Sequence, residues 1–220
     1  GIGKIDGIFV SHSDFDHIYG IIEVIKEIPT EFIVLSEAYV DDTDALTKEL
    51  LDIAKEKGIA IYYFRNGFSL HEGALVIECV YPKAEALFYK DNNGKSLVLK
   101  LSYKDFTALL MGDLEKEQEA ELCDNSSIHA DLVKVPHHGS KTSSSDLFVS
   151  SVAPKVAVLS YGLHNQFGHP SAAVVSRYRE NNCEDIHIAL EGAVIVTTKG
   201  KNFQVEGYLS KRKEIYSCSN

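Results

Sequence analysis

The sequence lacks long apolar runs. No window of about 18 apolar residues occurs, and a helix needs that length to cross a bilayer, so we expect no transmembrane helix within these 220 residues. The start of the chain also lacks a basic segment followed by an apolar one, so no signal peptide is visible in this sequence. The chain begins at Gly1 without Met, in what reads as the middle of a domain, so we expect a fragment of a longer protein.

Cysteine is scarce and scattered. None of the four cysteines forms a CxxC pair, which argues against a zinc ribbon. Free cysteine behaves as a small hydrophobic residue, so we predict buried or chemically idle thiols. Their positions are Cys79, Cys123, Cys183 and Cys218.

Positive charge is in deficit. The chain has 22 Lys and Arg residues against 32 Asp and Glu, giving a formal net charge of −10. This balance argues against broad, non-specific affinity for nucleic acid, and no stripe of Lys and Arg with interleaved aromatic residues appears. A nucleic-acid substrate stays compatible, because bound metal ions can supply positive charge where a phosphate sits.

What the sequence does contain is a dense polar cluster, Ser11-His12-Ser13-Asp14-Phe15-Asp16-His17. The apolar run before it predicts a strand over 5–11. Isoleucines at positions 18, 21, 22, 25 and 28 recur at helical spacing, which predicts a helix that Pro29 ends. The cluster therefore lies on a strand-to-helix loop, at the edge of a sheet where α/β proteins bind ligands.

The remaining pattern favours a layered α/β fold. Strands are predicted at 32–35 and 59–64 with a helix between them, which gives the order β-α-β-α-β for the first part of the chain. The middle part, 67–111, is rich in β structure and predicts two hairpins. The last third returns to alternating strands and helices and closes with strands up to about position 209. Residues 210–220 read as a polar, peripheral tail.

Four polar clusters each follow a predicted strand, so we expect their side chains to meet at one edge of the fold. They are His12/Asp14/Asp16/His17, Gly112-Asp113, His137-His138-Gly139-Ser140, and His164-Asn165 to Gly168-His169-Pro170.

The residue types in these clusters suit metal ions. Imidazole and carboxylate together are typical ligands of Zn²⁺, Mn²⁺ or Fe. A carboxylate at a strand end, such as Asp113, can bridge two ions. Two ions about 3.5–4 Å apart would clamp a phosphoryl or acyl centre and activate water at neutral pH.

Simpler explanations exist for each cluster. Asp14 and Ser13 could cap a helix, although capping needs one such residue rather than a group of four. Asp113 could cap the helix that follows it, and this role is compatible with metal binding. The His137-His138 pair could belong to an ordinary polar loop, and His169 could reflect helix-entry chemistry before a proline. For the other histidines outside the clusters we expect ordinary surface or strand positions; these are His71, His129 and His187.

The motifs, taken in order, resemble a known family. The segment from His12 to His17 is similar to the HxHxDH signature of the metallo-β-lactamase superfamily, with Asp14 in place of the second His. Together with the segments 109–113, 134–144 and 167–170, it resembles the hydrolase domain of ComEC-type competence proteins over nearly the whole chain.

This resemblance implies an αββα sandwich with two divalent metal ions, Zn²⁺ or Mn²⁺, on its loop edge. It implies one hydrolase domain over residues 1–209, N-terminally incomplete because the usual first strands would precede Gly1, followed by the tail 210–220.

The resemblance also implies roles for individual residues. His12 and Asp14 would hold one metal, Asp16 and His17 the other, and Asp113 would bridge them. The remaining metal ligand would be His137, with His138 as a ligand or general acid and His169 as a ligand or substrate contact. We predict Asp16 and His138 as the catalytic residues. Donors to a substrate phosphate would be Ser140, Lys141 and Ser143.

The predicted function is metal-dependent hydrolysis of DNA phosphodiesters in competence-linked DNA uptake. One alternative is a stand-alone hydrolase of a small thioester, lactone or phosphoester. Another is a non-catalytic module that binds DNA or a partner on a degenerate site. The resemblance further implies a bacterial domain, tethered to the cell membrane by channel segments of a larger parent protein and otherwise cytoplasmic. The oligomeric state stays open.

Overall fold

The computed structural model describes residues 1–40, 43–84, 89–124 and 128–219. The chain forms two compact units, residues 1–68 with 79–98 and residues 69–78 with 99–220. The strands β5 (Leu75–Tyr81) and β6 (Val98–Tyr103) carry the chain from one unit to the other. No helix in the described ranges has the length and apolar character that crossing a bilayer requires.

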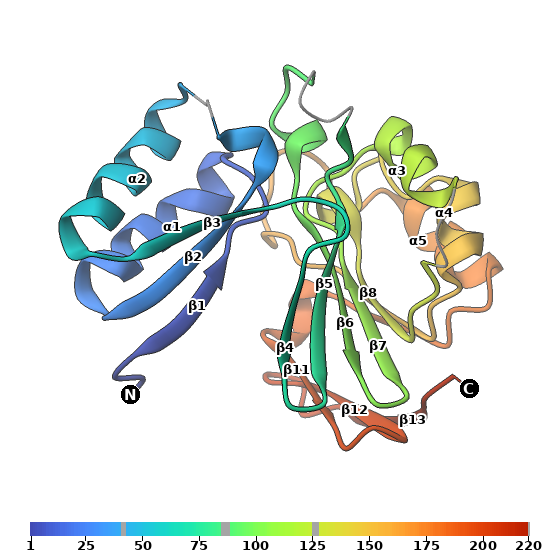
Figure 1. Ribbon diagram of the computed structural model, residues 1–220. Helices are drawn as coiled ribbons and strands as arrows, with labels where there is room; N and C mark the ends of the chain where they lie inside the picture. Colours follow the sequence, from blue (N-terminus) through green and yellow to red (C-terminus); the bar gives the residue numbers. More distant parts are fainter. Residues whose placement is uncertain (41–42, 85–88, 125–127, 220) are drawn as a thin grey trace. The chain divides into compact units, whose positions relative to one another are not determined.

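The first unit contains the predicted β-α-β-α-β segment. Its strands β1 (Ile5–Phe9), β2 (Thr30–Ser36) and β3 (Ala60–Phe64) pair in parallel in that order. The connections are the helices α1 (Phe15–Glu27) and α2 (Ala45–Lys57), drawn in blue and blue-green in Figure 1. The ends of α2 follow from its sequence: Asp44 caps the helix by accepting from Leu46 and Thr47 N–H, and Gly58 ends it in the left-handed conformation.

The core of this unit explains the isoleucine pattern. Ile18, Ile22 and Ile25 of α1 are fully buried, and they pack with Ile33 of β2 and Leu50 of α2 in one cluster. The 3.6-residue period therefore buries one face of α1 against the sheet. This packing fixes where α1 begins, and with it the loop that carries the polar cluster.

The second unit is built on a seven-stranded sheet in the order β10-β9-β8-β7-β6-β5-β4. The antiparallel part contains the two predicted hairpins, β4 (Ser69–Glu72) with β5 and β6 with β7 (Phe106–Leu110). The parallel part continues from β7 through β8 (Leu132–Lys134), β9 (Val156–Val158) and β10 (Asp185–His187). Each of these last three strands has three residues.

Helices and a second sheet cover this seven-stranded sheet. The helices α3 (Lys116–Cys123), α4 (Asp146–Val152) and α5 (Ala172–Glu180) gather together, as Figure 1 shows. The second sheet is antiparallel and consists of β11 (Val194–Thr198), β12 (Asn202–Gly207) and β13 (Lys213–Ser217). Its inward side chains Phe203 and Val205 pack with Phe106 and Val156 of the larger sheet in one buried cluster.

The predicted polar tail needs a correction. Residues 213–217 form β13, which pairs with β12 along its whole length. Tyr216 is buried in the cluster with Phe203, because a strand places alternate side chains on its inner face. The segment therefore completes a sheet, although its composition is polar. Asn220 lies outside the described residues.

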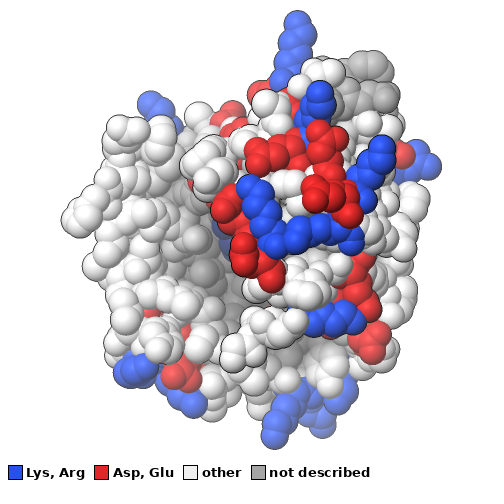
Figure 2. Space-filling model, turned by 90° about the vertical axis from the view of Figure 1, so that its left-hand side faces the viewer, with Lys and Arg blue, Asp and Glu red and all other residues white. Residues whose placement is uncertain are grey.

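Charged side chains of both signs are interspersed on the surface. On the face drawn in Figure 2, the largest charged area contains Lys and Arg side chains alternating with Asp and Glu. Lys26 of α1 makes ion pairs of this kind, with its Nζ 2.7 Å from Glu23 of the same helix and 3.3 Å from Glu49 of α2. Mixed charges of this kind give little attraction to a nucleic-acid backbone.

Candidate metal centre

The loop after β1 is held by backbone hydrogen bonds within the first unit. Val10 N–H donates to Val34 O (2.9 Å), and Leu97 N–H donates to Ser11 O (2.6 Å). Ser13 N–H donates to the hydroxyl of Tyr39 (3.1 Å), a fully buried side chain. The loop therefore has one defined course, which presents His12 to His17 at the carboxyl edge of the parallel sheet.

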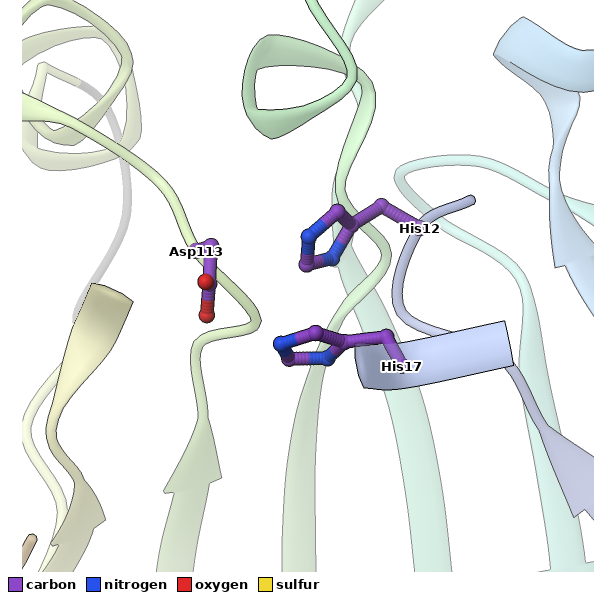
Figure 3. Close-up of side chains that lie close together, drawn as sticks. All are labelled: His12, His17 and Asp113. Atoms are coloured by element: carbon purple, nitrogen blue, oxygen red, sulfur yellow. The ribbon is translucent and has the colours of Figure 1, made fainter. Parts of the chain in front are cut away.

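Two imidazoles of this loop lie against each other. The ring centroids of His12 and His17 are 4.0 Å apart, and Figure 3 shows His12 on the loop and His17 at the start of α1. Ser11 Oγ lies 3.2 Å from Nδ1 of His12 and 2.9 Å from Nδ1 of His17. Ser11 thus occupies the Nδ1 side of both rings, which leaves Nε2 of each ring to face other groups. A polar partner on the second ring nitrogen is typical of histidines that ligate metals.

Two carboxylates face those Nε2 atoms. Asp14 Oδ2 lies 3.6 Å from Nε2 of His12, and Asp16 Oδ2 lies 3.8 Å from Nε2 of His17. His12 is fully buried, Asp14 is half-buried and Asp16 is exposed. Each imidazole therefore has one carboxylate beside its Nε2 atom.

Asp14 occupies the N-cap position of α1 but does not act as a cap. Its carbonyl accepts from His17 and Ile18 N–H, while its carboxylate accepts from none of the described N–H groups of the helix. The carboxylate instead accepts from Asn92 Nδ2 (2.8 Å). Asn92 O in turn accepts from the hydroxyl of Tyr39 (3.3 Å). The capping explanation of Asp14 therefore loses its main support, because a capping side chain bonds to the helix N–H groups.

In the second unit the central residue is Asp113, which follows β7. Gly112 has a φ of +55°, so the chain turns sharply there, and the side chain of Asp113 is almost completely buried. Asp113 Oδ2 lies 3.2 Å from His138 Nε2, and Oδ1 lies 3.6 Å from Lys134 Nζ. Lys134 also donates to Gly112 O (3.4 Å). The ends of β7 and β8 are thereby linked through Asp113, which Figure 3 shows on the loop after β7.

The histidine pair after β8 has an uncommon backbone. His137 and His138 both have positive φ values, +46° and +52°, in the 3₁₀ turn Pro136–Gly139. A left-handed backbone is costly for residues other than glycine and is often found at functional sites. His138 Nδ1 lies 2.7 Å from Ser160 O, so Nε2 faces Asp113. The hydrogen bond with Asp113 raises the pKa of His138 against the opposing effect of burial.

His169 is positioned by an asparagine. Asn165 Oδ1 accepts from His169 N–H (2.9 Å), and Asn165 Nδ2 donates to His169 O (2.8 Å). The ring of His169 lies 5.7 Å from that of His137, centroid to centroid, and stacks on Phe167. Burial lowers the pKa of His169, and the nearby His137 and His138 lower it further.

The predicted phosphate donors divide into two kinds. Ser143 is buried, and its hydroxyl donates to the carbonyl groups of Pro136 and Ser140. Ser140 is also buried, with its Oγ 2.9 Å from Thr142 Oγ1. Both serines hold the loop in shape. Lys141 is exposed and extends from the same loop.

Each unit therefore gathers one part of the predicted site. The first unit brings His12, Asp14, Asp16 and His17 together, and the second brings Asp113, His138, His137 and His169 together. Sequence reasoning assigned no role to Ser11, Tyr39, Asn92, Lys134 and Asn165. Ser11, Lys134 and Asn165 lie within the quoted motif segments and so carried a local signal, whereas Tyr39 and Asn92 lie outside them.

This fold, with two groups of histidine and carboxylate side chains at its loops, is typical of a class of metal-dependent hydrolases. Residues 1–163 match the metallo-β-lactamase superfamily, and the chain belongs to it. Its α/β architecture, with mixed sheets and flanking helices, is the metallo-β-lactamase fold.

Among curated proteins the chain is homologous to competence proteins. It is 30% identical to ComE operon protein 3 of Bacillus subtilis over 195 residues, 88% of this chain and 25% of that protein. It is 36% identical to competence protein ComA of Neisseria gonorrhoeae over 106 residues, 47% of this chain and 15% of that protein. The chain thus spans a quarter or less of the length of these relatives.

A solved structure shares the fold. The metallo-β-lactamase fold protein YhfI of Bacillus subtilis superposes with a TM-score of 0.50 at 12% identity, covering 84% of this chain and 74% of YhfI. At this identity the similarity concerns the fold alone.

Proposed function

We propose that the chain acts as a metal-dependent phosphodiesterase that hydrolyses DNA. The observation that carries this proposal is the placement of Asp14. Its carboxylate lies at a helix N-terminus, accepts from Asn92 and faces His12 instead of capping the helix. A carboxylate at this position makes the ligand set richer in oxygen than a cage of histidines, which suits Mn²⁺ as well as Zn²⁺.

The donor set of each unit fits divalent ions. In the proposed arrangement His12 and Asp14 would hold one ion, Asp16 and His17 would hold the second, and Asp113 would bridge them with His137 as a further ligand. Nitrogen and carboxylate ligands of this mixture are typical of dinuclear hydrolytic sites. When bound, the ions would neutralise charge on a phosphoryl group and supply a nucleophile at neutral pH.

The other side chains handle the substrate in this proposal. His138 is held through Nδ1 by the Ser160 carbonyl and faces Asp113 with Nε2, the nitrogen that would protonate a leaving oxygen in this proposal. Lys141 extends into solvent from the same loop and would contact a phosphate oxygen. Ser140 and Ser143 contribute by holding that loop, and His169 lies beside His137, where it would contact the substrate.

DNA is proposed as the substrate because of the homologues. One similar protein is named competence protein ComA, another is named ComE operon protein 3, and the recombination protein 2 of Haemophilus influenzae is 32% identical over 105 residues. Competence means uptake of DNA, so DNA is the natural candidate substrate for a phosphodiesterase domain related to such a protein. We further propose that the domain works beside membrane-embedded segments of a larger bacterial parent protein, since it matches 25% of the length of ComE operon protein 3.

The test is cleavage of plasmid and single-stranded DNA with Mn²⁺ or Zn²⁺. We expect cleavage by the native protein and loss of at least about a hundredfold in rate for Asp14→Ala with Asp16→Ala, because second-sphere changes alone cost 10–100-fold. A matched control is Asp6→Ala with Asp52→Ala, which removes two exposed carboxylates of the same unit. Elemental analysis should report bound metal in the native protein and the control and less in the variant.

Other outcomes would replace the proposal. Turnover of a small thioester, lactone or phosphoester without cleavage of any DNA form would favour a small-molecule hydrolase. Less than one metal per chain, with DNA binding that survives changes to His12 and His17, would indicate a non-catalytic binding module.

A further inference from the structure

The second unit contains a basic cavity that none of the candidate metal ligands lines. It has a volume of about 750 Å³ and lies between two hairpin turns, the turn from β6 to β7 and the turn from β11 to β12. Three lysines line it, Lys104, Lys199 and Lys201, together with one carboxylate, Asp105. A chain with a net charge of −10 thus concentrates positive charge at one hollow of its surface.

The lysine of the first turn is held in place by the second turn. Lys104 Nζ donates to Lys199 O (3.4 Å), and the methylene groups of Lys104 lie across Gly200. A Cβ atom at Gly200 would come within 2.6 Å of Lys104 Cδ, and the φ of +109° at this position also favours glycine. These contacts place the Lys104 side chain along the second turn, beside the cavity.

The second turn is itself rigid. Thr198 Oγ1 donates to Asn202 O (2.8 Å) and accepts from Gly200 N–H (3.0 Å). Cys218 N–H donates to Lys201 O (2.9 Å), which ties the turn to the end of β13. Lys199 and Lys201 thus extend from a turn with a defined backbone. Ile215 adds an apolar side chain to the cavity wall.

The cavity and Asp113 lie at opposite ends of the same strand. The β6–β7 turn precedes Phe106, and Asp113 follows Leu110, so the five residues of β7 separate them. Five residues of a strand span about 17 Å. A single DNA strand would therefore have to extend over several nucleotides to reach from the cavity to Asp113.

We propose that this lysine cavity binds phosphate groups of a single DNA strand, at a distance from the hydrolytic site. The inference rests on the proposed function, which makes DNA the substrate. Ammonium groups attract phosphate as point charges, and the neighbouring Thr197 and Gln204 side chains offer polar contacts. The cavity would hold the strand several nucleotides from the scissile bond and would compensate for the acidic surface elsewhere.

The test measures binding of a labelled single-stranded oligonucleotide by fluorescence anisotropy, with a chelator present so that neither metal nor cleavage contributes. We expect Lys199→Gln with Lys201→Gln to weaken binding about tenfold at low salt. The slope of log affinity against log salt should become shallower by about 1.4, since each phosphate contact contributes about 0.7 on single strands. The matched control is Lys48→Gln with Lys55→Gln, which removes two exposed lysines of α2.

The possible outcomes separate this inference from the proposed function. Affinity and slope equal to those of the control would overturn the cavity proposal, even if the protein cleaves DNA. Competition by a mononucleotide as effective as by the oligonucleotide would also overturn it in favour of a nucleotide site. Loss of binding in the lysine variant, with no DNA cleavage under any metal, would support the cavity while removing the nuclease proposal. Circular dichroism of both variants checks that they fold.

Discussion

Asp14 stands at a helix N-cap position, but its side chain does not cap the helix. A short polar side chain before a helix normally stabilises it by accepting from its first N–H groups. Here Asn92 Nδ2 donates to Asp14 instead, across 78 positions of sequence, and the backbone carbonyl alone serves the helix. A side chain held in this way keeps one oriented oxygen for another partner. Asn92 is therefore a positioning residue for the carboxylate that distinguishes this site.

Replacing Asn92 with Ala should weaken metal binding. We expect about a tenfold loss in affinity for Mn²⁺ or Zn²⁺, because outer partners that orient a ligand contribute 10–100-fold. Isothermal titration calorimetry with each metal ion measures this affinity. Asn181→Ala is the matched control, since it also removes one amide hydrogen bond, to Arg177 O (2.9 Å). Equal affinities for the two variants would show that Asn92 does not orient a ligand.

At the level of elements, the loop that carries the histidine pair depends on α3. Glu119 of this helix is buried, and its carboxylate accepts from the backbone N–H groups of Ser144 and Ser145. Ser145 in turn caps α4 by accepting from Phe148 N–H (3.2 Å). Lys116 N–H donates to Thr142 O (3.1 Å) at the start of α3. One helix therefore fixes the chain from Thr142 to the beginning of the next helix.

Glu119 should make stability depend on pH. Burial raises the pKa of its carboxyl above the usual 4.5, although the backbone hydrogen bonds oppose this effect. A raised pKa in the folded state means that folding is favoured more below pH 4.5 and that this contribution is lost as pH rises through the folded-state pKa. Urea unfolding should therefore show that the stability of the native protein, relative to Glu119→Gln, increases as the pH is lowered from 7.5 towards 4.5.

The Glu119→Gln protein is the reference for this comparison, because glutamine does not titrate and the two proteins share all other titratable groups. A stability difference that stays constant over this pH range, or that shrinks towards low pH, would contradict the role of burial at Glu119.

At the scale of the whole molecule, the end of the chain belongs to the core of the second unit. Tyr216 of β13 stacks on Phe203 with ring centroids 5.2 Å apart, and its hydroxyl donates to Asp185 (2.6 Å). Arg212 also contacts Asp185. Burial works against ionisation of Asp185, but the hydrogen bonds from Tyr216 and Arg212 hold its pKa below the usual value. The last strand is therefore joined to β10 as well as to its own sheet.

Tyr216→Ala should destabilise the protein by about 3–5 kcal/mol, the range found when a large buried aromatic side chain is removed. Tyr216→Phe keeps the ring and loses only the hydroxyl, so we expect about 1 kcal/mol. Urea unfolding monitored by circular dichroism measures both changes. If the alanine variant is as stable as the native protein, residues 210–219 are a peripheral tail after all.

Local patterns were sufficient for much of the fold. The isoleucines before Pro29 define α1, Asp44 and Gly58 bound α2, and the turn at Lys104–Asp105 joins β6 to β7. These signals come from residues close in sequence, where helical spacing, capping and turn chemistry act. The exceptions are informative: β13 is polar in composition, and its one buried aromatic residue gives too weak an alternation to recognise.

The polar motifs, their order along the chain and their ligand types follow from the sequence, because each motif is a short segment after a strand. The partners of those motifs depend on tertiary contacts. Asn92 reaches Asp14, Lys134 reaches Asp113, and Lys104 packs on Gly200, over separations of 78, 21 and 96 positions. Such pairings leave no periodic trace in a sequence. They arise when strands from distant segments pair and bring their ends together, and that pairing orients the candidate ligands and forms the lysine cavity.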